Sequence, residues 1–402
     1  MPFPPDRGDK IRSSHILRHI AKNAPVHVAT FAETDLDLAE EPQLARLAAS
    51  HCLVRRTKPL AVAGIEALVR SKPVSLTAFH SPRLADYVER TLRERPIATI
   101  YVFSGQMGQY VPDWFSGQVL LDFVDVDSAK FEAYAANGAG PRAWLDAREG
   151  RLLQREEVRM SRRATMSLLV SAEEADLFAQ RLPDTDRDEC AVMALRNGID
   201  STSFDPVSIV PEAPLQESPG PRLIFTGQMD YPPNVAAVER AVRRLMPAIR
   251  ESWPDAGYHV VGRNPPDSLK ALDGLHGCRV WGEVADIRTW LAAADLALVP
   301  LEIARGVQNK VLEAMAMQLP VVLSPQAATG IGACDGEHFA IGDDDQALID
   351  HVLALLADPS SSALLGLRAR RFVIDELSWE AALDPLTALL PSALHRHEKR
   401  AA

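Results

Sequence analysis

The 402-residue chain is too long for a single hydrophobic core and predicts two or three domains. Its composition, 47% hydrophobic and 24% charged, is that of a folded globular protein rather than a disordered one. The net charge of −11 excludes nucleic acid as an expected partner, because phosphate binding needs a basic surface. The four cysteines show no metal-ligand spacing, no apolar run reaches membrane-spanning length and no signal-peptide pattern opens the chain. We therefore expect a soluble cytoplasmic protein.

Strand-like apolar runs alternate with helix-length amphipathic segments along the whole chain, which predicts an α/β fold with parallel sheets. In the first half the expected strands are 27–31, 52–54, 97–103, 119–124, 166–170 and 191–195. In the second half they are 222–227, 258–262, 280–282, 296–299 and 321–323. We expect two Rossmann-like, doubly wound domains that face each other across a cleft, with ligands at the carboxyl ends of the strands.

The domain boundary is predicted at a stretch rich in proline. Residues 206–221 contain five prolines and little periodicity, and are therefore interpreted as an interdomain linker. The first domain is then 1–205 and the second 222–380, and a C-terminal helix with a basic tail occupies 381–402.

The beginning of the chain departs from the expected pattern. A Rossmann domain normally begins with a central strand, but here a loop, 2–9, follows Met1 directly and leads into an expected helix, 10–22. Our hypothesis is a misassigned start or a truncation that removes this strand. Mass spectrometry of the natural amino terminus would contradict it by finding Met1 or Pro2 there.

The most informative stretch is 298–322, which predicts a strand, a loop, a helix that opens after Gly306, and a second strand. A glycine followed by free helical N–H groups suits an anionic ligand. Arg305 is unfavourable beside that helix end unless an anion binds there. Lys310 and Glu313 are three apart and share a helix face. Lys310 is suited to bind a phosphate, and Glu313 is suited to bind sugar hydroxyls. The alternative interpretation is an ordinary exposed pair beside a solvated Arg305.

Several motifs then resemble a known family. The run Arg305-Gly-Val-Gln-Asn-Lys-Val-Leu-Glu-Ala-Met-Ala316, followed by Pro320-Val-Val322, resembles the donor-site signature of glycosyltransferase family 4. Three further segments, 197–200, 225–234 and 260–265, are similar to other motifs of that family. There is also a resemblance to one bacterial subgroup, the sugar transferases associated with PEP-CTERM/exosortase systems and exopolysaccharide loci. It is found in segments 4–12, 101–107 and 122–128.

The resemblance implies a GT-B fold, a nucleoside-diphosphate sugar donor, retention of anomeric configuration, and no metal or other cofactor. It assigns the ribose hydroxyls to Glu313. Arg305 replaces the first glutamate of the family, which contacts the transferred sugar. The segment 104–107 replaces a histidine near the reacting sugar, and Gln228 and Met229 replace an Arg/Lys pair that contacts the donor phosphate.

Other donor contacts are expected from the loops that follow the strands of the second domain. Gly227 would let backbone approach the donor phosphate, although it is equally a turn glycine. Arg263 is either a diphosphate or base-side contact or a solvated loop residue. Glu283 falls where a base-recognition loop is expected, and Val307 belongs to the Gly306 loop.

Acceptor-side residues are expected in the first domain. Gly8 and Asp9 stand in the first loop, and Ser104 and Gln106 follow the third expected strand. Asp122 and Asp125 lie at the end of the fourth, where either could face an acceptor hydroxyl or assist its deprotonation.

The favoured prediction is a retaining glycosyltransferase that moves a sugar from a nucleotide donor to a glycan or lipid-linked acceptor. Arg305, Lys310 and Asp125 are its predicted catalytic residues. A nucleotide-sugar 2-epimerase and a catalytically weakened scaffold that binds nucleotide or glycan are the alternatives; a dehydrogenase is disfavoured because no Gly-x-Gly-x-x-Gly follows a strand. The basic, partly apolar helix 10–22 and the basic end 395–400 also suggest peripheral contact with the inner face of the plasma membrane.

Overall fold

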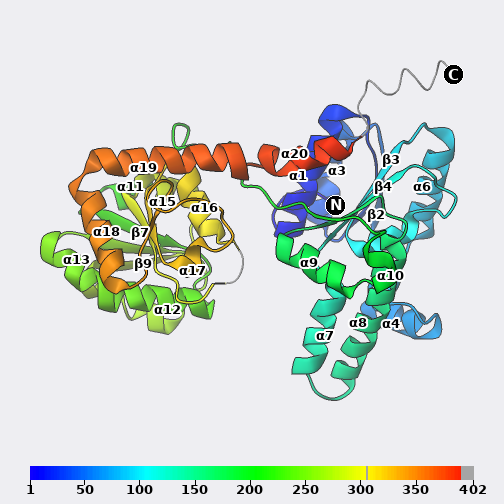
Figure 1. The fold of residues 1–402 in the computed structure, drawn as a ribbon, viewed down its shortest axis with the longest axis horizontal. Coiled ribbons are helices and arrows are strands. Elements are labelled where there is room, and N and C mark those ends of the chain that lie inside the picture. Colours follow the sequence, from blue (N-terminus) through cyan, green and yellow to red (C-terminus); the bar gives the residue numbers. More distant parts are fainter. Residues whose placement is uncertain (305–306, 391–402) are drawn as a thin grey trace. The chain divides into compact units, whose positions relative to one another are not determined.

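The computed structural model describes residues 1–304 and 307–390, and it divides into two compact units (Figure 1). The first unit is Met1–Asn197 together with the C-terminal segment from Ala382, and the second is Gly198–Ala381. The chain therefore passes between the units twice. Helix α20, Trp379–Leu389, contains the second passage.

This division corrects the predicted domain boundaries. The first passage falls after Asn197 rather than near residue 205, and the proline-rich stretch is part of the second unit. That stretch contains helix α11, Ala213–Gln216, whose Leu215 is fully buried. Glu212 accepts a hydrogen bond from the Thr289 hydroxyl at 2.8 Å. The stretch packs against its unit because a buried leucine and specific polar contacts hold it there.

The strands of the first unit form two parallel sheets rather than one. β1 (His27–Ala32) pairs with β2 (Ser50–Arg55). The second sheet has the order β3 (Thr99–Phe103), β4 (Gln118–Val124), β5 (Met166–Leu169) and β6 (Val192–Ala194). Before β1, the described residues contain helix α1 (Gly8–Asn23) and no strand. The predicted α/β architecture with parallel sheets is confirmed, and in this unit its strands are divided between two sheets.

Helices surround these two sheets. Three of them, α1, α3 (Glu41–Leu47) and α6 (Pro82–Glu94), pack near β1 and β2. Two others, α7 (Asp127–Asn137) and α8 (Gly140–Ser161), form a long antiparallel hairpin (Figure 1). The helices after α1 are α2 (Asp35–Ala39), α3 (Glu41–Leu47), α4 (Leu60–Val69), α5 (Val74–Ala78), α6 (Pro82–Glu94), η1 (Gly105–Tyr110), α7 (Asp127–Asn137), α8 (Gly140–Ser161), α9 (Ala172–Arg181) and α10 (Asp184–Arg187).

Helix α1 belongs to the core of the first unit. Ile16 and Leu17 are buried, and Leu17 packs with Phe3 and Leu44. The Arg12 side chain is only 1% exposed. Ile16 and Leu17 are thus covered by protein, whereas Ile11 is 38% exposed, so the membrane contact of 10–22 stays a prediction. The basic end 395–400 lies outside the described residues.

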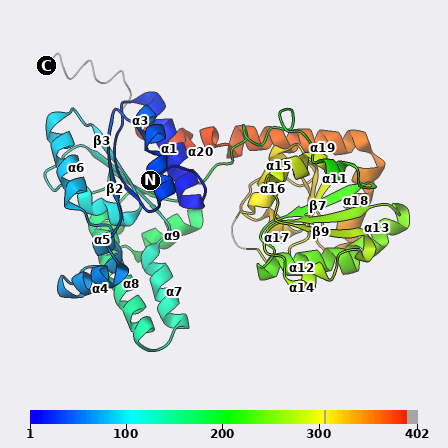
Figure 2. The ribbon, with the colours of Figure 1, turned by 180° about the vertical axis from the view of Figure 1, so that it is seen from behind.

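The second unit contains one six-stranded parallel sheet with helices on both faces (Figure 2). Its order is β12 (Ala340–Ile341), β11 (Val321–Leu323), β10 (Leu296–Val299), β7 (Arg222–Thr226), β8 (Gly257–Val261) and β9 (Cys278–Gly282). The chain runs outward from β7 to β9 and then outward from β10 on the other side. The strand order thus reverses between β7 and β10, which is where doubly wound sheets bind ligands.

Between and after these strands, the described residues of this unit form α12 (Pro232–Arg240), η2 (Ala241–Leu245), α13 (Met246–Ser252), α14 (Asp267–Lys270), η3 (Leu275–Gly277), α15 (Ile287–Ala293), α16 (Asn309–Ala316), α17 (Pro325–Ala328), α18 (Asp345–Ala357), α19 (Pro359–Phe372) and η4 (Val373–Leu377).

Within the described part of the chain, no single helix is long and apolar enough to cross a membrane. One pair, α18 with the α19–η4 segment, reaches that length and composition only jointly, and it is bent by 108° at the break.

Candidate functional site

The candidate site lies at the carboxyl ends of β7 and β10. Gly227 follows β7, and the loop after β10 leads into α16, which begins at Asn309 rather than directly after Gly306. Arg305 and Gly306 lie outside the described residues, so their roles stay predictions. The rest of the predicted donor signature can be placed.

Lys310 is held against the loop that follows β7. Its Nζ donates a hydrogen bond to Asn234 Oδ1 at 2.6 Å and lies 4.9 Å from the centroid of the Phe225 ring. A Cβ atom added to Gly227 would stand 3.2 Å from Lys310 Cε and 3.5 Å from Nζ. The backbone therefore passes close to the lysine because residue 227 has no side chain. The structure brings together Gly227 and Lys310, which the sequence predicted as separate donor contacts.

Asn234 is the residue of this cluster that sequence reasoning missed. It lies in α12 and is only 4% exposed. Its Oδ1 accepts from Lys310, and its Nδ2 donates to the Gln228 carbonyl at 2.8 Å. The available signal was a polar residue directly after two prolines, at the end of the 225–234 motif. Its role is to fix the position of the lysine ammonium.

Arg263 joins the same cluster through the loop that follows β8. The Gly227 N–H donates to the Val261 carbonyl at 3.1 Å, and a Cβ on Gly262 would lie 1.7 Å from the Gly227 carbonyl oxygen. The two loops are thus in direct backbone contact. Arg263 Nη2 donates to Gln228 Oε1 at 3.1 Å and is exposed to solvent. A cation is therefore available beside the glutamine that replaces the basic pair of the family.

Glu283 and Val307 stand at the margins of this cluster. The Gly262 N–H donates to the Gly282 carbonyl at 2.8 Å, which places the backbone before Glu283 at the same sheet edge. The Glu283 side chain is exposed. Val307 is 45% exposed, and its Cγ2 would lie 3.2 Å from a Cβ on Gly330. The donor roles of Glu283 and Val307 therefore stay predictions.

Burial shifts the pKa values of Lys310 and Glu313 toward each other. Desolvation lowers the pKa of Lys310 from its usual 10.5 to about 8, partly offset by the nearby Glu313 carboxylate. Desolvation likewise raises the pKa of Glu313 from 4.5 to about 7, partly offset by Lys310. Both groups are thus poised near neutral pH, and a ligand that supplies negative charge and hydroxyl donors would favour their charged forms.

We expect nucleoside diphosphate to bind most tightly between about pH 7 and pH 8. Affinity should fall below about pH 7, where Glu313 protonates and loses acceptor capacity, and above about pH 8, where Lys310 loses its charge. The stability of the free protein depends on pH in the opposite sense. Burying the charged Lys310 ammonium destabilises the fold, and this destabilisation is relieved as pH rises from 8 toward 10.5. Burying the Glu313 carboxylate also destabilises the fold, and this is relieved as pH falls from 7 toward 4.5. Calorimetric titration with UDP across this range measures the profile, and a flat profile would contradict it.

In the first unit, Asp122 differs from its predicted role. It is fully buried and accepts from Arg12 Nε at 3.0 Å, Arg12 Nη2 at 3.1 Å and the Tyr101 hydroxyl at 2.7 Å. Arg12 also donates to Asn197 Oδ1 at 2.8 Å. The prediction that Asp122 faces an acceptor is corrected, because both carboxylate oxygens are enclosed and engaged by protein donors.

The carboxyl ends of β3 and β4 carry two unusual backbone conformations. Ser104 has φ of 72° and Val124 has φ of 71°, although neither is glycine. The Ser104 N–H donates to the Asp122 carbonyl at 2.7 Å, and the Val124 N–H donates to Asp122 Oδ1 at 3.2 Å. A branched residue in this region costs on the order of 1–3 kcal/mol and is held there by its surroundings. Such strain is common at functional sites and marks this edge as the candidate acceptor side.

The other predicted acceptor-side residues are accessible but engaged. The Ser104 hydroxyl donates to Gln106 Oε1 at 2.7 Å, so these two lie together. Asp125 lies 3.4 Å from Lys130 Nζ and is 45% exposed on its side chain. Asp9 pairs with Arg7 at 2.9 Å, and Gly8 begins α1 with open space at its Cβ position. Their contacts leave the acceptor and catalytic roles as predictions.

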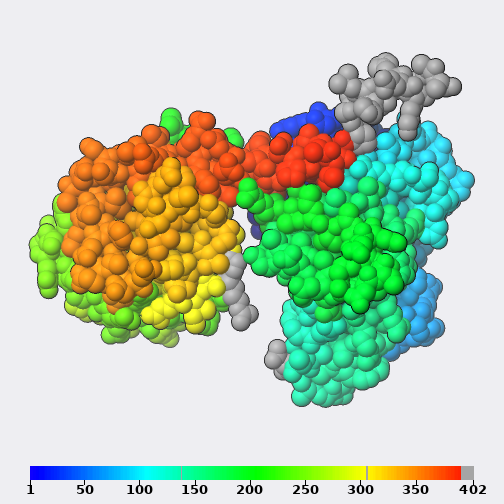
Figure 3. All heavy atoms as spheres, viewed as in Figure 1, coloured from blue at the N-terminus to red at the C-terminus, as the bar shows by residue number. Residues whose placement is uncertain are grey.

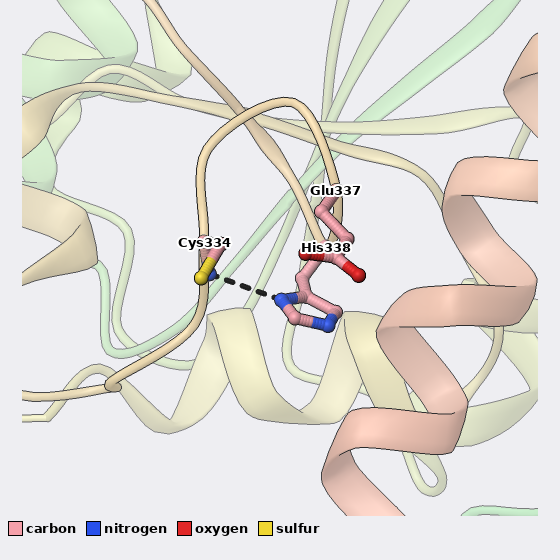
Figure 4. Close-up of side chains that lie close together, drawn as sticks. All are labelled: Cys334, Glu337 and His338. Atoms are coloured by element: carbon pink, nitrogen blue, oxygen red, sulfur yellow. Dashed lines mark hydrogen bonds between the residues drawn. The ribbon is translucent and has the colours of Figure 1, made fainter.

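One cluster of the described residues has the side chains to hold a metal ion. Cys334, Glu337 and His338 lie on the loop between α17 and β12, with ligand atoms within 4.8 Å of one another (Figure 4). The Cys334 N–H donates to His338 Nδ1 at 3.0 Å, and the His338 ring packs on Phe372 at 4.5 Å. These internal contacts account for the arrangement without an ion. The thiol and the carboxylate are exposed to solvent.

Two α/β units with parallel sheets, and a half-buried lysine at the switch point of the second unit's sheet, define a protein of the GT-B fold. Solved structures agree: HepE from Anabaena in complex with UDP superposes with a TM-score of 0.58 at 13% identity, over 95% of this chain and 96% of that chain. Sucrose-phosphate synthase from Thermosynechococcus elongatus superposes with a TM-score of 0.51 at 16% identity, over 94% and 100%.

Residues 220–358, which lie within the second unit, match the family described as glycosyl transferases group 1. A curated relative from Corynebacterium glutamicum, a GDP-mannose-dependent monoacylated alpha-(1-6)-phosphatidylinositol monomannoside mannosyltransferase, is 27% identical over 218 residues. The match covers 49% of this chain and 55% of the relative, so the chain matches about half of that protein's length.

Proposed function

We propose that the protein is a retaining glycosyltransferase that moves a sugar from a nucleoside-diphosphate sugar to a glycan or lipid-linked acceptor. The observation that carries the proposal is the Lys310 ammonium, held by Asn234 against Gly227 at the switch point of the second sheet. A cation fixed at this position suits a diphosphate. The family match over 220–358 and the UDP named in the HepE structure support this ligand class.

The chemistry follows from the position of the charge. The acceptor hydroxyl oxygen forms a bond to the anomeric carbon and gives up its proton to a base, while the bond from that carbon to the diphosphate oxygen breaks and its electron pair leaves with the nucleoside diphosphate. Lys310 would stabilise the charge that develops there, as Arg305 and Gly306 are also proposed to do. Glu313 would accept hydrogen bonds from the ribose hydroxyls. Asp125 stays the candidate for assisting the acceptor hydroxyl. Retention of configuration and independence from metal are implied by the resemblance to family 4, and activity that persists in EDTA would support the latter.

The finer assignment is to the bacterial subgroup associated with PEP-CTERM/exosortase systems, and hence to exopolysaccharide biosynthesis at the inner face of the plasma membrane. Three segments carry it, 4–12, 101–107 and 122–128. Each segment contains a residue already described in the first unit: Arg12 of α1, the strained Ser104, and Asp122 at the end of β4. The C. glutamicum relative, which by its name acts on a lipid-linked mannoside, supports a lipid-linked acceptor.

A thermal-shift titration with UDP, GDP and ADP tests the donor site. A nucleotide at a hundred times its dissociation constant should add about 2.7 kcal/mol of stability. Glu313→Ala should weaken binding by about 1–3 kcal/mol, because it leaves ribose hydroxyls without an acceptor. Glu251→Ala, at an exposed glutamate of α13, is the matched control and should bind like the wild type. Equal affinity in both variants would remove Glu313 from the site.

The two alternatives give different outcomes in activity assays. A 2-epimerase would convert a nucleotide sugar without any acceptor, whereas the transferase needs one. A scaffold would bind nucleotide or glycan without turnover. The replacement of the family's first glutamate by Arg305 is the observation that keeps the scaffold alternative under test.

A further inference from the structure

Helix α4 exposes its large apolar side chains and buries its small ones. Ala63 and Ala67 are fully buried, so the core-facing side of the helix consists of alanines. The large side chains point to solvent with exposures of 49% to 81%: Leu60, Val62, Ile65, Leu68 and Val69. Single exposed apolar residues are ordinary, but five large ones on one ten-residue helix call for an explanation.

This helix is firmly attached to the first unit. The Thr77 hydroxyl donates to the Ala63 carbonyl at 2.9 Å, and Arg148 Nη2 from α8 donates to the Ala67 carbonyl at 2.8 Å. Glu149, the next residue of α8, accepts from the N–H groups of Val74 and Ser75 at 2.8 and 2.9 Å and so holds α5. The exposed apolar residues therefore belong to a fixed surface rather than to a loosely packed segment.

The surface continues onto α8. Figures 1 and 2 both place α4 beside α8, and the Arg148–Ala67 hydrogen bond joins them. Trp144 and Leu145 precede Arg148 by four and three residues, so they share its helix face, and they are 57% and 45% exposed. The chain segment of α4 lies at the outer surface of the first unit (Figure 3). We call these seven residues, five from α4 with Trp144 and Leu145, the α4 surface.

The charge around the α4 surface is opposite to that of the whole protein. The chain carries a net charge of −11, whereas residues 58–72 contain three basic residues and one acidic residue. Two further basic residues, Arg55 and Arg56, are paired with Asp35 and Glu33. That acid, Glu66, is paired with Lys58 at 2.9 Å and with Arg70 at 3.2 Å. Arg70 and Lys72 are exposed at the end of the helix. A fixed apolar surface with a basic border complements a bilayer that contains anionic lipids.

We propose that the α4 surface docks the protein on an anionic phospholipid bilayer. Apolar side chains would enter the boundary between headgroups and acyl chains, Trp144 would lie at the headgroup level, and Arg70 and Lys72 would contact lipid phosphates. A second copy of the chain suits the surface less well. In a two-fold contact the same patch meets itself, which would bring the basic borders of both copies together. The proposal needs no occupied donor site.

Flotation of the full chain with vesicles of phosphatidylcholine, with and without phosphatidylglycerol, tests this proposal in the absence of nucleotide. The wild type should bind the anionic vesicles, and added salt should weaken binding. The double variant Ile65→Gln/Leu68→Gln should bind at least about tenfold more weakly, because it lacks two large apolar side chains that would be transferred from water into the bilayer. Arg70→Gln/Lys72→Gln should lose the preference for anionic lipid.

The matched control is Leu364→Gln/Leu367→Gln, which changes two exposed leucines three apart on α19 of the second unit, with exposures of 47% and 53%. It should bind vesicles like the wild type. Equal binding by the Ile65/Leu68 variant and this control would overturn the proposal, as would absence of wild-type binding to anionic vesicles. Sedimentation that shows self-association lost in the Ile65/Leu68 variant would instead assign the surface to a second copy. Nucleotide binding, measured separately, would be unchanged in all of these variants.

Discussion

Lys310→Met should weaken UDP binding by roughly 2–3 kcal/mol, about 30- to 150-fold, because it removes the charged donor from the diphosphate. The affinity for UMP, which lacks the second phosphate, should fall much less. Turnover should fall by about 10²–10³, the usual effect of removing one group that stabilises charge in a transition state. Because burial already holds the pKa of this lysine down at about 8, the variant without nucleotide should be as stable as the wild type or more stable. Calorimetry with UDP and UMP measures the affinities, a sugar-transfer assay measures turnover, and thermal unfolding measures stability.

Lys270→Met is the matched control for this prediction. Lys270 is an exposed lysine of α14 in the same unit, paired with Asp267 across one helical turn. Its substitution should change neither affinity nor turnover. If Lys310→Met bound UDP normally, the donor site assigned here would be wrong. If the variant lost stability together with affinity, Lys310 would be a structural residue and the binding loss would be secondary.

Arg12→Met should destabilise the first unit by about 3–5 kcal/mol, because it leaves the Asp122 carboxylate buried without its cation. For a unit of this size the unfolding midpoint would fall by roughly 6–20 °C. Asp122 would keep only the Tyr101 hydroxyl and the Val124 N–H as donors. Amide hydrogen exchange should rise in β3 and β4 and stay unchanged in the second unit.

Two further variants separate the buried pair from an ordinary surface pair. Arg7→Met removes an exposed arginine that pairs with Asp9 and Glu33, and it should cost less than about 1 kcal/mol. The double variant Arg12→Met/Asp122→Asn should lose less stability than the sum of its single changes, because no charge is left buried alone. Additive losses would mean that Arg12 and Asp122 contribute independently.

The strand pattern could be predicted from the sequence because a buried parallel strand is a continuous apolar run between turn residues. The run 296–299 matches β10 and 321–323 matches β11. β12 was missed because two residues, Ala340 and Ile341, are too short to form such a run. The interpretation of 206–221 as a linker rested on its composition, and composition does not show that Leu215 is buried in the second unit.

The sequence by itself determined the fold class and the residue types of the donor site, since both depend on local periodicity and on short motifs such as 305–316. Only the tertiary structure decided what lies against those residues. Asn234 reaches Lys310 across 76 positions, and Arg12 reaches Asp122 across 110. Burial then sets the charge state of Lys310 and Glu313, encloses Asp122, and leaves the apolar side chains of α4 exposed. Desolvation depends on every neighbour in space, so no local pattern of residues can specify it.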